Sequence, residues 1–174
     1  MTTSTRTRVE MLLAATAMIV SLSTLAVYLY QAKVMGEQQR TAVWPYLEWS
    51  TTNIEGYRFS VRNKGVGPAL VKRVVMRVEG VEVKSNRELI ERLMGPQGVV
   101  KGWVNSALER RVLSPGEEVI PLFIKDPGEA RAFEAQLRKR NFEMEITFAS
   151  IYGDTWRCDG FEVVRLPERQ PGLF

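Results

Sequence analysis

The chain of 174 residues contains no histidine and a single cysteine, Cys158. Without histidine it cannot form a Ser-His-Asp or Cys-His nucleophilic centre, a histidine-containing zinc site or an imidazole pH sensor. One cysteine cannot make a disulfide within the chain, so a folded domain must be held together by packing. Cys158 itself is either a buried small apolar group or an exposed thiol that pairs with another chain.

The sequence also lacks the short motifs of common catalytic and nucleotide-binding sites. It contains no calcium-loop spacing, no phosphate-binding glycine loop followed by Lys-Ser/Thr, no nucleophile elbow and no Ser-x-x-Lys pattern. Residues 1–40 hold 4 basic and 2 acidic side chains and residues 41–174 hold 20 and 18, without a long basic run. This balance does not indicate nucleic-acid binding. We therefore expect no enzyme, no catalytic residues, no metal, no cofactor and no nucleic-acid partner.

Two pairs of carboxylates are the remaining candidates for acid–base chemistry or calcium binding. Asp154 and Asp159 flank Trp156, and Asp126 and Glu129 lie at a predicted helix start. Turn and cap roles explain all four carboxylates without a site. We therefore expect them to be structural.

Apolar residues are abundant near the N-terminus. Met11–Tyr30 reads MLLAATAMIVSLSTLAVYLY, without a charge, a proline or a glycine. A helix of that length spans about 30 Å, the hydrocarbon thickness of a bilayer. The run is longer than the apolar region of a cleaved signal peptide, and bulky residues follow it where cleavage requires small ones. The sequence therefore predicts an uncleaved, single-pass membrane anchor.

Basic residues around this span predict its orientation. Arg6 and Arg8 precede it together with Glu10, whereas only Lys33 and, further out, Arg40 follow it. Positive charge favours the cytoplasmic side of a membrane. We therefore expect a cytoplasmic N-terminus and a C-terminal domain outside the cytoplasm, in the periplasm or at the cell surface.

The rest of the chain divides around the anchor. We expect a cytoplasmic tail at residues 1–10, disordered up to Arg8, a helical stalk at 31–43, a β domain at 44–166 and an irregular tail at 167–174. The stalk should end at Trp44-Pro45, because proline cannot continue the hydrogen bonding of a helix.

Alternation with a period of two residues predicts the strands of the domain. The expected strands are 45–52, 56–63, 69–79, 81–84, 118–125, 142–152 and 155–165. In the second of these, Tyr57, Phe59 and Val61 fall on one face. Gly153-Asp154 should form a hairpin turn, and Asp159-Gly160 a bulge or a second turn.

Two short helices are predicted from their caps. Ser85 and Glu88 have the spacing of a capping box, and Asp126, Pro127 and Glu129 supply an N-cap, a first-turn proline and an acidic residue. Strands without regular βαβ alternation predict a mainly β fold, an immunoglobulin-like antiparallel β-sandwich with two short helical insertions. No element is assigned between positions 99 and 111.

Two segments of the chain carry a resemblance, VWPYLE at 43–48 and RNKGVGPA at 62–69. They resemble a group of uncharacterised bacterial single-pass membrane proteins. In that group an anchor and a stalk lead into an extracytoplasmic β-sandwich with an N-x-G-x-G-P-A turn between its early strands. The resemblance covers the anchor and the first third of the domain. It implies architecture and location and carries no activity or site residues.

The turn in the second segment has two interpretations. Gly65 and Gly67 permit positive φ, Pro68 fixes the exit of the chain, and Asn63 can hydrogen-bond to nearby backbone. Successive N–H groups could hold an anion, which would make the turn a loop presented to a ligand. Alternatively the glycines only shape a crossover between strands, and this second interpretation is the one we favour.

Trp103 fits no predicted strand, so we expect it to be the most exposed of the four tryptophans. Together with Val99, Val100 and Leu108 it forms a candidate partner surface. The function expected first is that of a membrane-anchored interaction or accessory module, with the lipid bilayer and a protein or a second copy as partners. The alternative is a ligand-binding or sensory ectodomain that signals through a membrane partner.

Overall fold

The computed structural model describes residues 3–95, 100–160 and 162–167 of the chain. The chain divides into two compact units, Met1–Ala42 and Val43–Phe174. The first unit is a single helix, α1 (Thr3–Ala42), and the second carries all of the described strands. A mainly β domain that follows an apolar helix, as the sequence predicts, is thereby confirmed.

Helix α1 is continuous and begins earlier than expected. The prediction of a disordered tail up to Arg8 is wrong from Thr3 onward, because these residues are already helical. No proline or glycine separates them from the apolar run, and each residue added to an existing helix gains a hydrogen bond at little further cost. After Tyr30 helix α1 continues to Ala42, so residues 31–42 of the predicted stalk are helical.

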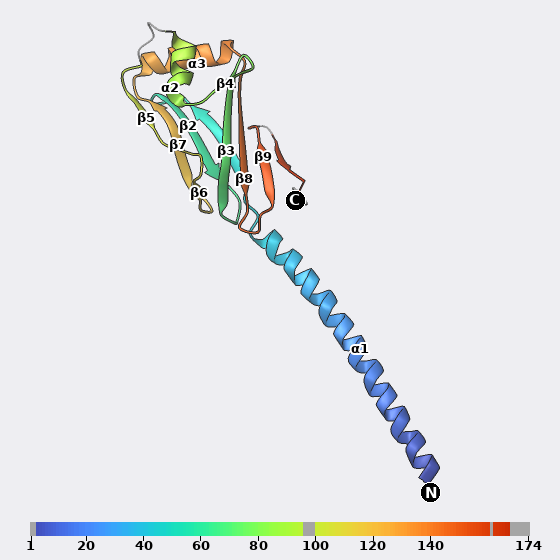
Figure 1. Ribbon diagram of the computed structural model, residues 1–174. Helices are drawn as coiled ribbons and strands as arrows, with labels where there is room; N and C mark the ends of the chain where they lie inside the picture. The colour runs from blue at the N-terminus through green and yellow to red at the C-terminus, as the bar shows by residue number, and fades with distance from the viewer. Residues whose placement is uncertain (1–2, 96–99, 161, 168–174) are drawn as a thin grey trace. The chain divides into compact units, whose positions relative to one another are not determined.

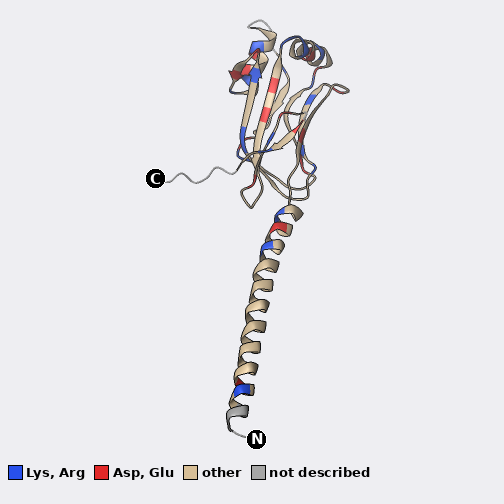
Figure 2. Ribbon diagram, turned by 90° about the vertical axis from the view of Figure 1, so that its right-hand side faces the viewer, with Lys and Arg blue, Asp and Glu red and all other residues tan. Residues whose placement is uncertain are grey.

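The middle of α1 is long and apolar enough to cross a membrane. In Figure 2 the charged residues of α1 lie near its two ends, with an uncharged stretch between them. The hydroxyl groups in this stretch donate hydrogen bonds to backbone carbonyls of the preceding turn. These bonds run from Thr16 to Leu13, from Ser21 to Ala17, from Ser23 to Ile19 and from Thr24 to Val20. A hydroxyl satisfied within its own helix needs no water, which suits a lipid environment.

The second unit consists of two antiparallel sheets on either side of a hydrophobic core (Figure 1). The described strands are β1 (Leu47–Thr52), β2 (Tyr57–Asn63), β3 (Ala69–Val78), β4 (Val81–Val83), β5 (Trp103–Asn105), β6 (Val112–Leu113), β7 (Glu118–Ile124), β8 (Phe142–Ala149), β9 (Thr155–Cys158) and β10 (Val163–Arg165). One sheet has the order β1-β2-β7-β5. The other has the order β10-β9-β8-β3-β4, and β6 also pairs with β3.

The period-two pattern locates the long strands well, and Tyr57, Phe59 and Val61 are all buried as predicted. The last strands of the domain differ from the predicted ranges 142–152 and 155–165. Strand β8 stops at Ala149 because the chain turns there, with Ser150 N–H donating to Asp154 O at 2.9 Å. The segment 155–165 forms two strands, β9 and β10, and Asp159-Gly160 is a second turn between them.

The two short helices, α2 (Asn86–Met94) and α3 (Pro127–Lys139), lie together at one end of the sheets (Figure 1). Both begin at the predicted caps. Ser85 Oγ accepts a hydrogen bond from Glu88 N–H at 3.2 Å, and Asp126 Oδ1 accepts bonds from the second and third residues of α3. Phe133 of α3 is completely buried and packs edge-on against Tyr57 with ring centroids 4.9 Å apart. The helices therefore extend the core beyond the ends of the strands.

The connection from β2 to β3 crosses from one sheet to the other and lies against the first residues of the β domain. Lys64 N–H donates to Tyr46 O at 2.8 Å, and Val66 N–H donates to Trp44 O at 3.0 Å. This contact leaves no room for a side chain on the turn. A Cβ atom added to Gly67 would lie 1.8 Å from the carbonyl oxygen of Val43.

We predict that Gly67→Ala destabilises the β domain by about 2–4 kcal/mol, because the added carbon meets rigid backbone and must push two chain segments apart. Gly102→Ala is the matched control, since a Cβ there meets no atom within 4 Å. Urea unfolding of the full-length chain in detergent measures both. Equal midpoints for the two variants would contradict this account of the turn.

Candidate functional site

A cavity of about 450 Å³ lies between the two sheets of the β domain. Side chains of both sheets line it: Phe59 and Leu122 on one side, Val74, Met76, Phe142 and Met144 on the other. Leu89 of α2 and Leu137 of α3 complete the apolar wall. The volume falls in the range of small-molecule sites, and a cavity of about 150 Å³ already holds benzene. Benzene has about six non-hydrogen atoms, so a cavity about three times as large has room for an apolar group of about 18 such atoms.

Polar side chains surround the mouth of the cavity. Asn86 Nδ2 donates to Asn105 Oδ1 and to Pro121 O, both at 2.9 Å, and so ties the start of α2 to β5 and β7. Arg73 and Glu82 form an ion pair across β3 and β4 at 3.8 Å. Both of these side chains are at least half exposed, so the pair contributes little to stability. The mouth thus combines the hydrogen-bonded carboxamide of Asn86 with two exposed charged side chains, Arg73 and Glu82, that are free to change conformation.

Tyr57 lies on the wall of the cavity and is nearly fully buried. Burial raises the pKa of its phenol well above the ordinary value, and the negative charge of Glu134 makes a smaller contribution in the same direction. The hydroxyl therefore stays protonated at neutral pH. It can supply a neutral hydrogen-bonding group in an otherwise apolar wall, and it cannot act as a base.

The four residues of the predicted partner surface do not form an exposed patch in the described structure. Val100 and Leu108 belong to the hydrophobic core, with 7% and 6% of their surface exposed. Trp103 lies in β5, an unpredicted strand paired with β7, and is half-buried against the core. Val99 lies outside the described residues. The prediction that Trp103 is the most exposed tryptophan is wrong, since Trp44 is 42% exposed.

The predicted ligand turn is a structural junction. Asn63 is completely buried, and its carboxamide uses all of its ordinary bonds: Oδ1 accepts from Tyr46 N and Gly65 N, and Nδ2 donates to Gly67 O and Leu113 O. The N–H groups that an anion would need are already bonded within the chain. These contacts favour the crossover interpretation of Asn63, Gly65, Gly67 and Pro68 over a loop presented to a ligand.

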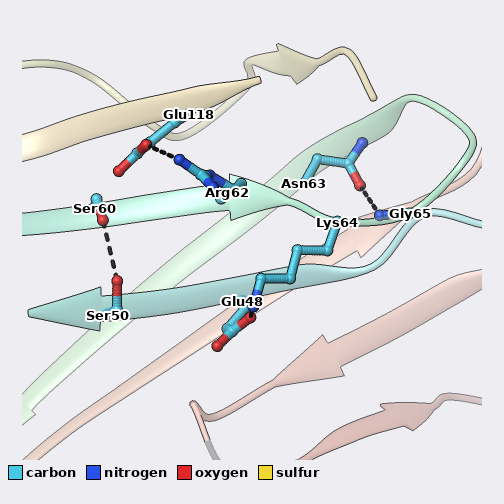
Figure 3. A network of polar contacts seen from close by, with 8 residues as sticks. All are labelled: Glu48, Ser50, Ser60, Arg62, Asn63, Lys64, Gly65 and Glu118. Carbon is cyan, nitrogen blue, oxygen red and sulfur yellow. Dashed lines mark hydrogen bonds and ion pairs between the residues drawn. The ribbon is translucent and has the colours of Figure 1, made fainter. Parts of the chain in front are cut away.

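The outer face of the β1-β2-β7 sheet carries a ladder of polar pairs (Figure 3). Lys64 pairs with Glu48, Arg62 donates to Glu118 at 2.5 Å, and the hydroxyls of Ser50 and Ser60 lie 3.2 Å apart. Opposite charges face each other across neighbouring strands, as cross-strand pairing favours. These partners satisfy one another, so the face gives no specific indication of a ligand.

The carboxylates considered for catalysis have structural roles. Asp154 pairs with Arg165, Asp159 Oδ1 accepts from Glu162 N–H, and Glu129 accepts from Lys101 N–H. Asp126 caps α3. Within residues 3–95, 100–160 and 162–167, no group of three metal-ligating side chains occurs. Neither metal binding nor acid–base chemistry is indicated there.

Cys158 is buried in the core, so the first of its two interpretations is confirmed. Burial raises the pKa of its thiol above the ordinary value. The thiolate form, which reacts and pairs with other chains, is therefore disfavoured.

No pattern in the sequence predicted the cavity, which is the feature of the described structure most suited to binding. Its wall residues carry the ordinary signals of a core: Met76 and Met144 fall on the inward faces of β3 and β8, as the alternation predicts. Periodicity tells which side chains point inward. It does not tell whether the opposing side chains meet, so no sequence signal separates a filled core from a hollow one.

The fold and the cavity define this chain as an apolar N-terminal helix joined to a β-sandwich with an open cavity between its sheets. Residues 5–162 match a family described as a domain of unknown function (DUF8453), and the chain belongs to that family. The match includes most of α1 as well as most of the β domain, so the family spans both parts of the chain. No curated protein and no solved structure matches the chain.

We predict a pH effect at Glu118 on the outer face. Hydrogen bonds from Arg62 and then from Ser60 lower the pKa of this carboxyl below its unfolded value of 4.5. The bonds stabilise the folded state fully above pH 4.5, and the gain is lost as the pH falls through the folded pKa. Glu118→Gln should therefore be less stable than the parent at pH 7, and the difference should shrink towards pH 3.

Chemical unfolding at a series of pH values measures this difference. Glu55→Gln, at an exposed position of the β1–β2 turn, is the control and should change little at any pH. A difference between Glu118→Gln and the parent that stays constant from pH 7 to pH 3 would refute the assignment.

Proposed function

We propose that this protein is a membrane-anchored binding protein whose β domain holds an apolar ligand between its two sheets. The cavity is the observation that carries the proposal: it has a volume of about 450 Å³ and an apolar wall built from both sheets and both short helices. Protein interiors are normally packed without voids larger than a water molecule. This cavity opens to solvent, so an apolar ligand that entered it would remove its apolar wall from water, which is favourable.

Of the two functions expected from the sequence, the ligand-binding ectodomain has the stronger support. The function expected first, an interaction module acting through Trp103 and its neighbours, has less support, because Val100 and Leu108 are buried and the described members of that set form no exposed apolar surface. A group bound between the sheets would contact two helices and strands of both sheets at once. Filling the cavity would therefore stiffen the whole sandwich, and in this proposal that change is the signal to a partner in the membrane.

The location is part of the proposal. In this proposal Met11–Tyr30 crosses the bilayer with the N-terminus in the cytoplasm, and residues 44–166 lie in the periplasm or at the cell surface. The helix length, the uncharged middle of α1 and the internally bonded hydroxyls support the membrane span. Arg6 and Arg8 before the span support the orientation.

The strand order supports the immunoglobulin-like class. In immunoglobulin-type sandwiches one sheet has the order A-B-E-D, and the other contains C and F between G and C′. Here β1-β2-β7-β5 and β9-β8-β3-β4 follow the same two orders, and β10 and β6 are additions. Helices α2 and α3 are then insertions in two connections of this framework, and both contribute to the cavity wall.

Binding rather than catalysis is proposed for this site. The chain has no histidine, and Tyr57 keeps its proton. Among the residues that line the cavity the charged ones are Arg73, Glu82, Lys84 and Glu109, two of each sign. These features suit recognition of an apolar body with a small polar end.

We predict that Val74→Trp, which places an indole in the cavity, lowers the affinity for the fluorescent naphthalene probe 1-anilinonaphthalene-8-sulfonate at least tenfold. The larger side chain occupies the space that the probe needs. Val104→Trp is the matched control: it is the same substitution at a 59% exposed position of β5 and should leave the affinity unchanged. Fluorescence titration of the full-length chain, corrected for empty detergent micelles, measures both.

Two results would contradict the proposal. If the parent chain does not raise the fluorescence above that of empty micelles, the cavity does not bind an apolar molecule of this size. If Val74→Trp and Val104→Trp bind the probe equally, with unfolding midpoints close to the parent, the probe binds elsewhere.

A further inference from the structure

Strand β3 has an unpaired stretch beside the mouth of the cavity. Along one side β3 pairs with β8; on the other side β4 pairs with Met76–Val78 and β6 pairs with Ala69-Leu70. The backbone of Val71 is still bonded, to Arg110 N–H at 3.1 Å and Arg111 O at 2.8 Å. Within the described parts of the chain, no strand covers this side of β3 between Val71 and Met76.

The hairpin between β3 and β4 shows which backbone groups face the open side. Its two turn residues, Glu79 and Gly80, both have positive φ, 53° and 78°, as in a type I′ turn. Val78 and Val81 close this turn as a hydrogen-bonded pair, and the pairing alternates along the strand. Met76 and Val74 therefore direct their N–H and C=O groups to the same side as Val78. At Met76 that side is covered by β4, whereas no described strand covers it at Val74.

The side chain of Val74 lines the cavity, and residues on each side of the gap line its mouth, among them Glu82 of β4 and Ala107. Residues directly opposite each other on antiparallel strands project their side chains to the same face of the sheet. A residue that pairs with the free backbone of Val74 would consequently project its own side chain into the cavity. At Val74, therefore, a backbone N–H and C=O without a strand partner lie next to the apolar cavity.

We propose that an extended peptide segment of a partner protein adds to β3 at Val74 and inserts a large apolar side chain between the sheets. This inference rests on the proposed function and names the ligand class of the same cavity. A peptide matches both free groups of Val74 at once, as in other complexes formed by strand addition. The cavity, about three times the size of one that holds benzene, accepts even an indole ring.

The charges beside the gap specify the neighbours of the inserted residue. Residues on either side of it point to the outer face of the sheet, since side chains alternate along a strand. Lys72 and Arg73 are exposed there, and the ion pair of Arg73 with Glu82 is long, at 3.8 Å. Acidic residues flanking a large apolar residue therefore complement this edge.

The test uses the full-length chain in detergent and blocked pentapeptides of sequence Ala-Glu-X-Glu-Ala, in which X is Leu, Phe, Trp or Ala. Competition against the naphthalene probe measures their affinity. We expect the peptides with Leu, Phe or Trp to displace the probe and the Ala peptide to do so at least tenfold more weakly. Hydrogen exchange of the Val74 amide should be fast in the free protein and slow in the complex.

A pair of methylated peptides separates strand addition from simple apolar binding. N-methylation at X removes the N–H that donates to Val74 O, and it should lower the affinity at least tenfold. N-methylation at the preceding Glu is the matched control, because that N–H points away from β3, and it should have little effect. Equal affinities of the two methylated peptides would overturn the inference.

The remaining outcomes separate the two proposals. If the probe binds the parent chain but not the Val74→Trp variant, and no peptide displaces it at up to about 1 mM, the cavity holds a small molecule. The proposed function then stands and the inference is wrong. If the probe does not bind the parent chain, the proposed function is wrong and the inference falls with it.

Discussion

The buried carboxamide of Asn63 is the constraint on which the β domain depends. Its four hydrogen bonds join three segments that are distant in the sequence: the entry at Tyr46, the crossover at Gly65–Gly67 and the end of β6 at Leu113. A buried amide that lost these partners would cost several kcal/mol, so the three segments are fixed together. Their junction sets where β2 leaves one sheet and β3 enters the other. This junction therefore helps to hold the two sheets face to face.

The same topology explains why the core is hollow on one side. The chain crosses between the sheets at Asn63, and it crosses again after β5, where Leu108 is buried. Strands β4 and β6 each cover only part of the β3 edge, and a stretch around Val74 is left between them. Helices α2 and α3 extend the wall at one end without filling the space. The cavity, its mouth and the open strand edge are therefore consequences of one arrangement.

The sequence predicted much of this fold and little of its site, for physical reasons. Long alternating strands and capped helices are local features, so Ser85 and Asp126 marked the helix starts correctly. Strand β5 has only three residues, and pairing with β7 rather than its own pattern makes it a strand, which is why Trp103 was misplaced. The cavity depends on distances between side chains as far apart in sequence as Tyr57 and Met144, and no local pattern encodes those distances.

The most direct test of the central claim is to observe the methionine methyl groups of the cavity wall by carbon-13 NMR while the naphthalene probe is added to the full-length chain. Met76 and Met144 line the cavity, whereas Met94 of α2 does not. Binding between the sheets predicts large, saturable shifts of the first two signals and a much smaller change of the third. Signals of Met76 and Met144 that stay in place while the probe binds would contradict the account.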